Sequence, residues 1–363
     1  MPPGECRNRD AAARSSRAAA IVRWLPALVA FALAGCGWIG LGWGAVTFPT
    51  TAAGESANVV AHGRFAYSTR GADGIEIIDL ATPAVRRVMV PAPETSADDL
   101  AIADALLFVL DAQPPGHLAI YSLTDPAAPQ LVQAPVPVEV GPFSGVSAGG
   151  GLVVVSGGTS LLSLRRYLAE GRLSTDLATA DLGRGQPDVL LSADGRYAYV
   201  SVHDQGPDFS LVVLELSAEP LAMRELARLP LDTYGFTPGG ARPASFPIEM
   251  ASTGRLLLIA SAAGLQVLDI ADPAQPQRVA TLQAGALPVN VDARPGLAAV
   301  VGSDPSPELV LVDLADPAAP TLLRSSRLPA RSLATGVALT DRHAVIAAHA
   351  GGTLIFDINQ LTQ

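Results

Sequence analysis

One short phrase recurs seven times along the chain, and this repeat limits the possible folds more than any other feature of the sequence. Each copy is a short, largely apolar run, and four of the copies end in Asp followed by Leu or Ile. The copies lie at residues 74–80, 117–123, 160–165, 210–216, 264–270, 308–314 and 353–358. They recur at intervals of roughly 43 to 54 residues, a period that is typical of the blades of a β-propeller.

The residues around each phrase predict four strands per repeat. An apolar run rich in Val, Leu and Ala precedes the phrase, as at 254–260. After several copies comes an Asp-Pro pair, as at 272–276, where the Asp side chain opens a turn and Pro presets φ. A further short run follows, as at 277–281. The sequence therefore predicts an all-β fold, a seven-bladed β-propeller of four-stranded antiparallel blades over residues 56–363.

Two repeats depart from this pattern. The copies at 160–165 and 210–216 lack either the terminal Asp or the Asp-Pro turn. We therefore expect the third and fourth blades to diverge from the others. The composition suits the same fold, because 34 Gly and 30 Pro favour many tight turns between short strands.

The phrase resembles the repeat that names the LVIVD-repeat family. The copies Leu265-Gln-Val-Leu-Asp269 and Leu309-Val-Leu-Val-Asp313 are the nearest to it, and the resemblance extends over nearly all of residues 56–363. It implies a β-propeller, usually of an exported or surface protein, whose biochemical activity is mostly unassigned. The resemblance thus predicts the fold well and the function poorly.

A second resemblance is local. The segment 187–200 is similar to the repeat of lactonase-type seven-bladed propellers, in which Asp-Gly, here Asp194-Gly195, makes a hairpin turn. The chain has one such copy, and a turn of this kind also suits a propeller of any other class.

The N-terminal segment has the features of an export signal. Five Arg residues between Arg7 and Arg23 precede an apolar stretch from Trp24 to Gly35. The stretch closes with Leu33-Ala34-Gly35-Cys36, which resembles the lipobox of bacterial lipoproteins. The resemblance implies that residues 1–35 are a signal peptide and that Cys36 carries the lipid.

An uncleaved anchor is the alternative, because apolar residues continue to Phe48 and the segment 24–48 is long enough to span a bilayer. Both interpretations place the propeller outside the cytoplasm, since the Arg cluster stays inside. We expect an extracytoplasmic, membrane-anchored protein at the bacterial outer membrane or cell surface, or on the periplasmic face of the inner membrane. Residues 36–55 would then be a tether that also offers a closing strand for the seventh blade.

The sequence predicts no catalytic residue, no cofactor and no metal site. The five His residues never stand at a short metal-ligand spacing, and no calcium or phosphate loop occurs. Gly145-Val-Ser-Ala-Gly149 matches the nucleophile-elbow pattern, but a strand rather than a helix is expected after it. Without residues 1–35 the net charge is about −13, so nucleic acid is a poor partner.

Candidate binding residues follow from propeller geometry, because inner strands line the central channel and two sets of loops open on one face. The polar candidates on inner strands are Asp98, Asp99, Asp188, Glu249, Asn290 and Asp292. The loop candidates are His203, Asp204 and His349. Solvated loop charge is the alternative role for all of them.

The segment 231–246 is a further candidate, because the repeat interval is longest there and long loops are often functional. It is rich in Gly and Pro and carries Tyr234, Phe236, Arg242 and Phe246, residue types enriched at binding hot spots.

From these features we expect a non-catalytic, monomeric scaffold that binds an unknown protein or small ligand at the cell envelope. An exported lactonase-type hydrolase with a site at the channel mouth is the alternative, and it would need converging carboxylates and His residues with shifted pKa values.

Overall fold

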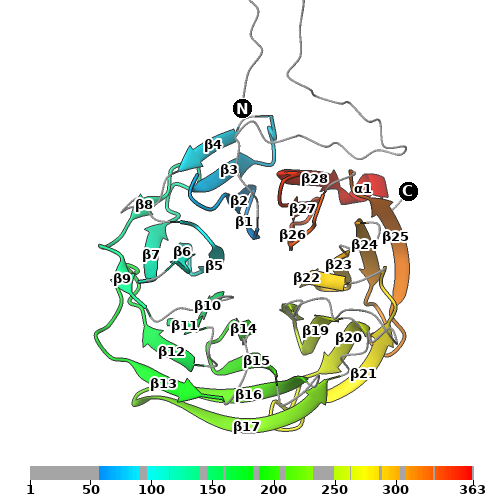
Figure 1. Ribbon diagram of the computed structural model, residues 1–363. Coiled ribbons are helices and arrows are strands. Elements are labelled where there is room, and N and C mark those ends of the chain that lie inside the picture. Colours follow the sequence, from blue (N-terminus) through cyan, green and yellow to red (C-terminus); the bar gives the residue numbers. More distant parts are fainter. Residues whose placement is uncertain are drawn as a thin grey trace, which may run out of the picture. The chain divides into compact units, whose positions relative to one another are not determined.

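The computed structural model describes residues 57–361, apart from 85, 90–95, 114, 139–144, 158–160, 183–187, 204–208, 232–248, 262, 286–287, 303–306 and 330–331. The described residues form seven antiparallel sheets arranged around a central channel (Figure 1), so the predicted seven-bladed β-propeller is confirmed. The predicted signal, anchor and tether lie outside the described residues, and so does Cys36.

The first four blades follow the chain in order from the innermost strand outward. Blade one contains β1 (Val59–His62), β2 (Phe65–Thr69), β3 (Ile75–Asp79) and β4 (Arg86–Met89). Blade two contains β5 (Asp99–Ala103), β6 (Leu106–Asp111) and β7 (His117–Ser122), with the short β8 (Gln130–Leu131) and β9 (Val136–Pro137) both paired to β7. Blade three contains β10 (Gly145–Gly149), β11 (Leu152–Ser156), β12 (Leu161–Arg166) and β13 (Ala178–Asp181). Blade four contains β14 (Asp188–Leu191), β15 (Tyr197–His203), β16 (Phe209–Ala218) and β17 (Leu221–Leu231).

The last three blades repeat this arrangement. Blade five contains β18 (Glu249–Thr253), β19 (Leu256–Ser261), β20 (Gly264–Asp269) and β21 (Gln277–Leu282). Blade six contains β22 (Pro288–Arg294), β23 (Leu297–Gly302), β24 (Glu308–Asp313) and β25 (Thr321–Arg327). Blade seven contains β26 (Gly336–Leu339), β27 (His343–Ala347) and β28 (Thr353–Asp357), followed by the short helix α1 (Ile358–Leu361).

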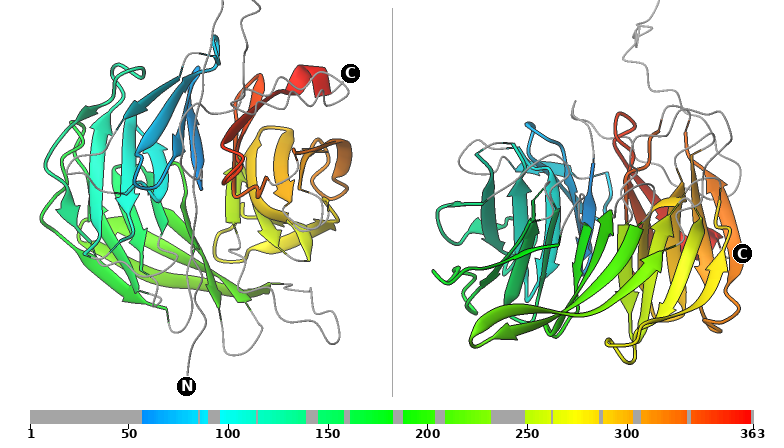
Figure 2. Two further views of the ribbon diagram at one scale, coloured as in Figure 1. Left: turned by 45° about the horizontal axis from the view of Figure 1, so that its top comes forward. Right: turned by 60° about the horizontal axis from the view of Figure 1, so that its bottom comes forward.

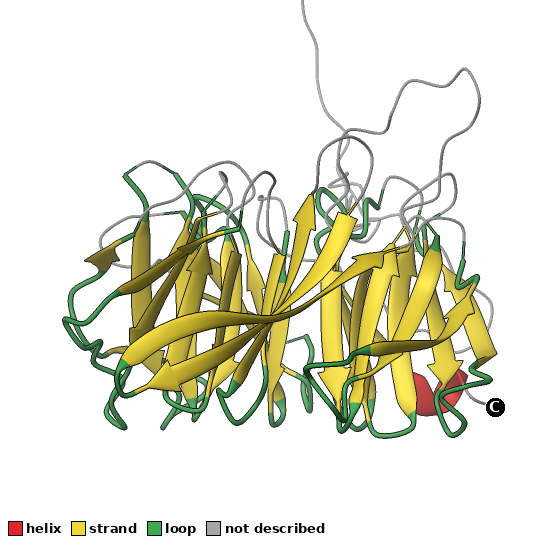
Figure 3. Ribbon diagram, turned by 90° about the horizontal axis from the view of Figure 1, so that it is seen from below, coloured by secondary structure: helices red, strands yellow, loops and turns green. Residues whose placement is uncertain are grey.

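Three blades differ from the predicted four-stranded pattern or from its usual length. Blade two has a fifth, short strand, since β8 and β9 both pair with β7. Blade seven has three strands within the described part of the chain. Blade four has an unusually long outer hairpin, β16 with β17, of ten and eleven residues, which is visible across the side of the ring (Figure 3). Its strand β17 reaches β12 and β13 of blade three, so the divergence expected for the fourth blade is a longer hairpin.

The recurring phrase is the third strand of each blade, and its terminal Asp has a structural role. In blades one, five, six and seven this Asp accepts a hydrogen bond from the backbone N–H two residues further on, at 2.8 to 3.0 Å. In three of these blades an Arg from the turn between the first two strands also pairs with it, as Arg64 does with Asp79 at 2.8 Å. The signature residue therefore ends the strand and holds the neighbouring turn.

The core is divided among the seven junctions between neighbouring blades. The middle strands are buried along most of their length because both faces of each sheet pack against another sheet, and each junction has its own apolar cluster. Counted over the described residues, the cluster between blades seven and one contains the fewest buried residues of the seven.

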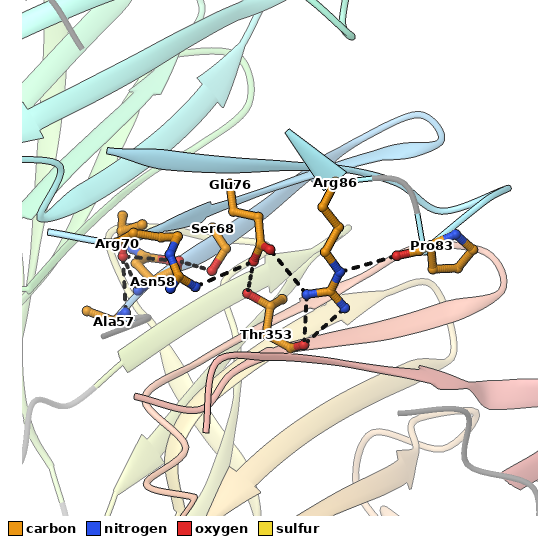
Figure 4. A network of polar contacts seen from close by, with 9 residues as sticks. Ala57, Asn58, Ser68, Arg70, Glu76, Pro83, Arg86 and Thr353 are labelled. Carbon is orange, nitrogen blue, oxygen red and sulfur yellow. Dashed lines mark hydrogen bonds and ion pairs between the residues drawn. The ribbon is translucent and has the colours of Figure 1, made fainter. Parts of the chain in front are cut away.

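A buried polar network supplements that smallest cluster (Figure 4). Glu76 of β3 is 1% exposed and accepts a hydrogen bond from the Thr353 hydroxyl of β28 at 2.9 Å. Its carboxylate also lies 3.3 Å from Arg86 and 3.8 Å from Arg70, both of which have buried side chains. Arg86 in turn donates to the backbone oxygen of Thr353 at 3.5 Å. The first and last blades are thus joined through one carboxylate.

The described residues contain no helix that is long and apolar enough to cross a membrane.

We predict that Glu76→Gln weakens the ring at this junction. The change leaves two buried guanidinium groups without the carboxylate that faces them, so the free energy of unfolding should fall by about 3 kcal/mol. Urea denaturation of the purified protein measures this. Glu219→Gln is the matched control, because Glu219 pairs with Arg166 on the surface, and it should leave the free energy nearly unchanged. Equal midpoints for the two variants would contradict the role given to Glu76.

Candidate functional site

The inner strands of the seven blades enclose a cavity of about 1110 Å³ along the channel. Figure 2 shows these strands standing side by side around the axis of the ring. The lining of the cavity includes residues of β1, β5, β10, β14, β18, β22 and β26. Since every blade contributes its first strand, residues distant in the sequence meet at this cavity.

Seven equivalent residues surround the end of the channel at which the inner strands begin, and we call them the entry ring. They are equivalent because each lies opposite the same position of the second strand of its blade. Five of them pair with that position directly, and Asn290 pairs with it next to a β-bulge. Asn58 lies just before β1, and its backbone oxygen accepts a hydrogen bond from the N–H of Thr69 at 2.9 Å. In ring order they are Asn58, Asp99, Gly145, Asp188, Glu249, Asn290 and Gly336. Three of the seven positions therefore carry carboxylates.

Five polar side chains of the inner strands accept hydrogen bonds from the backbone of the next blade. Asp99 accepts the N–H of Val146 at 2.7 Å, and Asn290 accepts the N–H of Val337 at 3.2 Å. Asp188 accepts the N–H of Met250 in the same manner. An inner strand is the free edge of its sheet, so its N–H groups need such partners.

The same contact recurs two residues deeper in the channel. Ser147 accepts the N–H of Leu191 at 2.9 Å, and Asp292 accepts the N–H of Leu339 at 2.7 Å. Ser147 lies within the strand β10 and not at a turn before a helix, which excludes the nucleophile elbow. Its hydroxyl is a link between blades three and four.

Glu249 is the exception in the entry ring. No hydrogen bond or ion pair joins its carboxylate to another residue of the described chain. Its side chain is one methylene longer than that of Asp99 or Asp188, which occupy the equivalent positions. The structure thus leaves one carboxylate of the ring available to a group that enters the cavity.

The three ring carboxylates hold protons more tightly than isolated acids do. Burial raises the pKa of Asp99 to about 6, against hydrogen bonds that lower it. Burial and the charge of Asp99 raise the pKa of Asp188 to about 7. Burial is the main reason why the pKa of Glu249 lies well above its usual value, and the negative charges of Asp188 and Asp99 raise it further. The three groups therefore share fewer than three negative charges near neutral pH.

Asp292 lies deeper in the channel and behaves similarly. Burial raises its pKa, while the N–H groups of Leu339 and Ala293 act in the opposite direction. Within the described part of the chain, no Arg or His side chain lines the cavity. The described residues also contain no group of three His, Cys, Asp or Glu side chains placed to hold a metal ion.

The predicted site residues are only partly brought together. Asp99, Asp188, Glu249, Asn290 and Asp292 line one cavity, as expected for inner-strand residues. Their binding role stays a prediction.

The other candidates are either tied to their own blade, outside the cavity lining or outside the described residues. Asp98 also borders the cavity, but its carboxylate accepts the N–H of Ala112 at 2.8 Å and the hydroxyl of Ser96 at 3.0 Å, which ties it to its own blade. His349 occupies a loop position with φ of 45° and is not part of the cavity lining, and His203 ends β15. Asp204, Tyr234, Phe236, Arg242 and Phe246 lie outside the described residues.

Sequence reasoning missed Asn58, which donates a hydrogen bond from its side-chain amide to Asp99. The signal was present, because Asn58 and Asp99 each stand five residues before the Gly63 or Asp104 that opens a hairpin turn. Aligning the repeats on this turn finds the entry ring, whereas aligning them on the third-strand phrase does not.

We predict that the three carboxylates of the entry ring lower the stability of the fold as the pH rises. Folded-state pKa values above the unfolded ones mean that the folded protein keeps protons that the unfolded chain releases. The free energy by which these bound protons stabilise the folded state is therefore fully present below about pH 4, and it is lost as the pH rises to about 7. Asp188→Asn should raise the thermal midpoint near pH 7.5 by roughly 2 °C or more and have little effect near pH 4.

Differential scanning calorimetry across this pH range measures the effect. Asp73→Asn, at an exposed turn, is the control and should match the wild type at each pH. A midpoint difference between Asp188→Asn and the wild type that does not change with pH would contradict the prediction.

Comparison with known proteins supports the fold. The family model of the LVIVD repeat matches residues 253–282, from the end of β18 to the end of β21. No curated protein matches the chain. A chain of the crystal structure of the mitotic checkpoint complex is similar with a TM-score of 0.60 at 11% identity, over 86% of this chain and 94% of that chain.

A computationally designed protein, Ika8, is similar with a TM-score of 0.51 at 12% identity, over 82% of each chain. Structural similarity at this level of sequence identity is evidence for the fold alone. The sequence match and the architecture together identify the chain as a seven-bladed β-propeller that carries the LVIVD repeat.

Proposed function

We propose that this protein is an exported, membrane-tethered binding scaffold whose channel mouth takes a positively charged group of a protein or small ligand. The acid-lined cavity is the observation that supports this proposal most directly. Its volume of about 1110 Å³ is close to the range of about 300–1,000 Å³ that is usual for small-molecule sites.

The electrostatics of the ring favour a cation. The charge of Asp99 raises the pKa of Asp188, and the charges of Asp188 and Asp99 raise the pKa of Glu249, so Asp188 and Glu249 resist ionisation while their neighbours are charged. An ammonium or guanidinium group among them offsets this repulsion and allows the carboxylates to ionise. Binding should therefore release protons near neutral pH.

Glu249 supplies the best contact for such a group. Asp99 and Asp188 already accept backbone N–H groups, whereas the carboxylate of Glu249 has no hydrogen-bond partner among the described residues. A charged hydrogen bond to it is worth about 1.5–3 kcal/mol. A metal ion suits this arrangement less well, because the described carboxylates do not form a three-ligand group.

Spermidine is a simple probe of the proposed function. We predict that it binds the wild-type protein and that Glu249→Gln weakens the binding about tenfold or more. Isothermal titration near pH 6.5 in two buffers of different ionisation enthalpy measures affinity and proton release together. Asp73→Asn and an uncharged diol of similar length are the controls. Absence of binding at millimolar spermidine, or equal binding by Glu249→Gln, would remove the support for a cation site.

The tether of this scaffold is proposed from Leu33-Ala34-Gly35-Cys36, with a spanning segment 24–48 as the other form of anchor. We predict that Cys36→Ser prevents lipid attachment and moves the propeller to the soluble fraction, because one acyl-bearing residue supplies the membrane affinity. Fractionation of producing cells with immunodetection measures this, with Cys6→Ser as the matched control. Continued membrane association of Cys36→Ser would favour the spanning anchor instead.

An exported hydrolase of lactonase type is a second candidate, and the raised pKa values favour it. A carboxylate such as Asp188, with a pKa near 7, is suited to general acid–base chemistry at neutral pH. The His residues that such a site would add do not line the described cavity. Hydrolysis of a lactone by the wild type that is lost in Asp188→Asn would favour this candidate over the scaffold.

A further inference from the structure

The wall of the channel changes from polar to apolar just inside the entry ring. The residues two positions further along the inner strands form a second level of the wall, which we call the middle ring. Five of its seven residues are apolar, namely Val60, Ala101, Leu190, Ala251 and Ala338. The other two are Ser147 and Asp292, and each already accepts an N–H group of the next blade. The middle ring therefore offers mostly apolar contacts.

Apolar side chains lie directly beneath the three carboxylates of the entry ring. Side chains two residues apart on a strand lie on the same face, so each carboxylate has a middle-ring residue of its own strand beneath it. The residues in these three places are Ala101, Leu190 and Ala251. Ala101 and Leu190 line the cavity and are partly exposed to it, and Leu190 is the largest apolar residue of the middle ring. A group held by the carboxylates therefore has apolar surface on its inner side.

An aromatic residue lies at the same end of the cavity. Phe209 opens β16 at the end of blade four where Asp188 opens β14, and it is the only aromatic residue among the described residues of the cavity lining. It packs against the apolar cluster that contains Met250, the neighbour of Glu249. Aromatic rings attract organic cations. The cavity is thus better suited to a cation that carries carbon than to a bare ion.

We propose that the ligand of the channel is an amphipathic organic cation, with its ammonium group among the carboxylates of the entry ring and a hydrocarbon chain directed inward along the middle ring. This inference rests on the proposed cation site and adds the chemical class of its ligand. The cavity extends four residues inward from the entry ring, to Ala103 and Gly149, which is roughly 13 Å along a strand and leaves room for a chain of several carbons. Each methylene that leaves water for an apolar wall tightens binding by about three- to fourfold.

The dependence of affinity on chain length tests the proposal on the wild-type protein. Isothermal titration near pH 6.5 with ethylammonium, n-butylammonium and n-hexylammonium should show about tenfold tighter binding of n-hexylammonium than of n-butylammonium. Equal affinities for the three ions, with spermidine still bound, would overturn the proposal and leave the cation site standing. Absence of binding by spermidine and by all three ions would overturn both.

Two substitutions separate the contact with the ammonium group from the contact with the chain. Leu190→Asn removes apolar surface from the middle ring and should reduce the tenfold ratio between n-hexylammonium and n-butylammonium to about threefold or less. Glu249→Gln should weaken the binding of both ions and preserve their ratio, because it changes the contact with the ammonium group alone. Leu177→Asn, at an exposed position outside the cavity lining, is the matched control and should bind both ions as the wild type does.

An unchanged ratio in Leu190→Asn would overturn the path of the chain along the middle ring. The thermal midpoint of each variant shows whether it is folded, and the wild-type series decides the question if Leu190→Asn does not fold.

Discussion

The junction between the first and last blades is the interaction on which the ring depends. The other six junctions join blades that follow one another along the chain, so a loop already holds each pair together. Blades seven and one have no such connection, and their apolar cluster is the smallest of the seven within the described part of the chain. The buried carboxylate of Glu76, with Arg70, Arg86 and Thr353 around it, supplies there a directional contact that the apolar side chains do not.

The channel presents a related problem of unpaired backbone groups. Every inner strand exposes one edge to the channel, and its N–H groups cannot all be satisfied by a neighbouring strand. Asp99, Asp188, Ser147, Asn290 and Asp292 reach across to the next blade and accept them. The carboxylates that give the cavity its acidity are thus also structural, which accounts for their presence independently of any ligand. Glu249 differs because no such contact occupies it among the described residues.

The sequence predicts the architecture well because the recurring phrase corresponds to a single structural element. Its apolar residues fill the space between blades, and its Asp ends the third strand, so seven copies imply seven sheets. The inner strands are harder to recognise, since their polar residues alternate with Val and Leu in short segments and vary in type between blades. Asp99 and Asp188 could be nominated from their position, but the bond between Asn58 and Asp99 depends on how neighbouring blades lie against each other. The long β16–β17 hairpin depends on such packing in the same way.

The hydrogen bond between Thr353 and Glu76 joins residues that are 277 positions apart. A contact over such a distance forms late, because the chain entropy lost in closing the loop must be offset by everything folded between its ends. During synthesis Glu76 is made long before Thr353. The Arg side chains and the apolar face of the first blade therefore stay uncovered until the last blade has been synthesised and has folded. The ring therefore matures only when the chain is nearly complete, and a chain cut short before Thr353 would lack a partner for its own beginning.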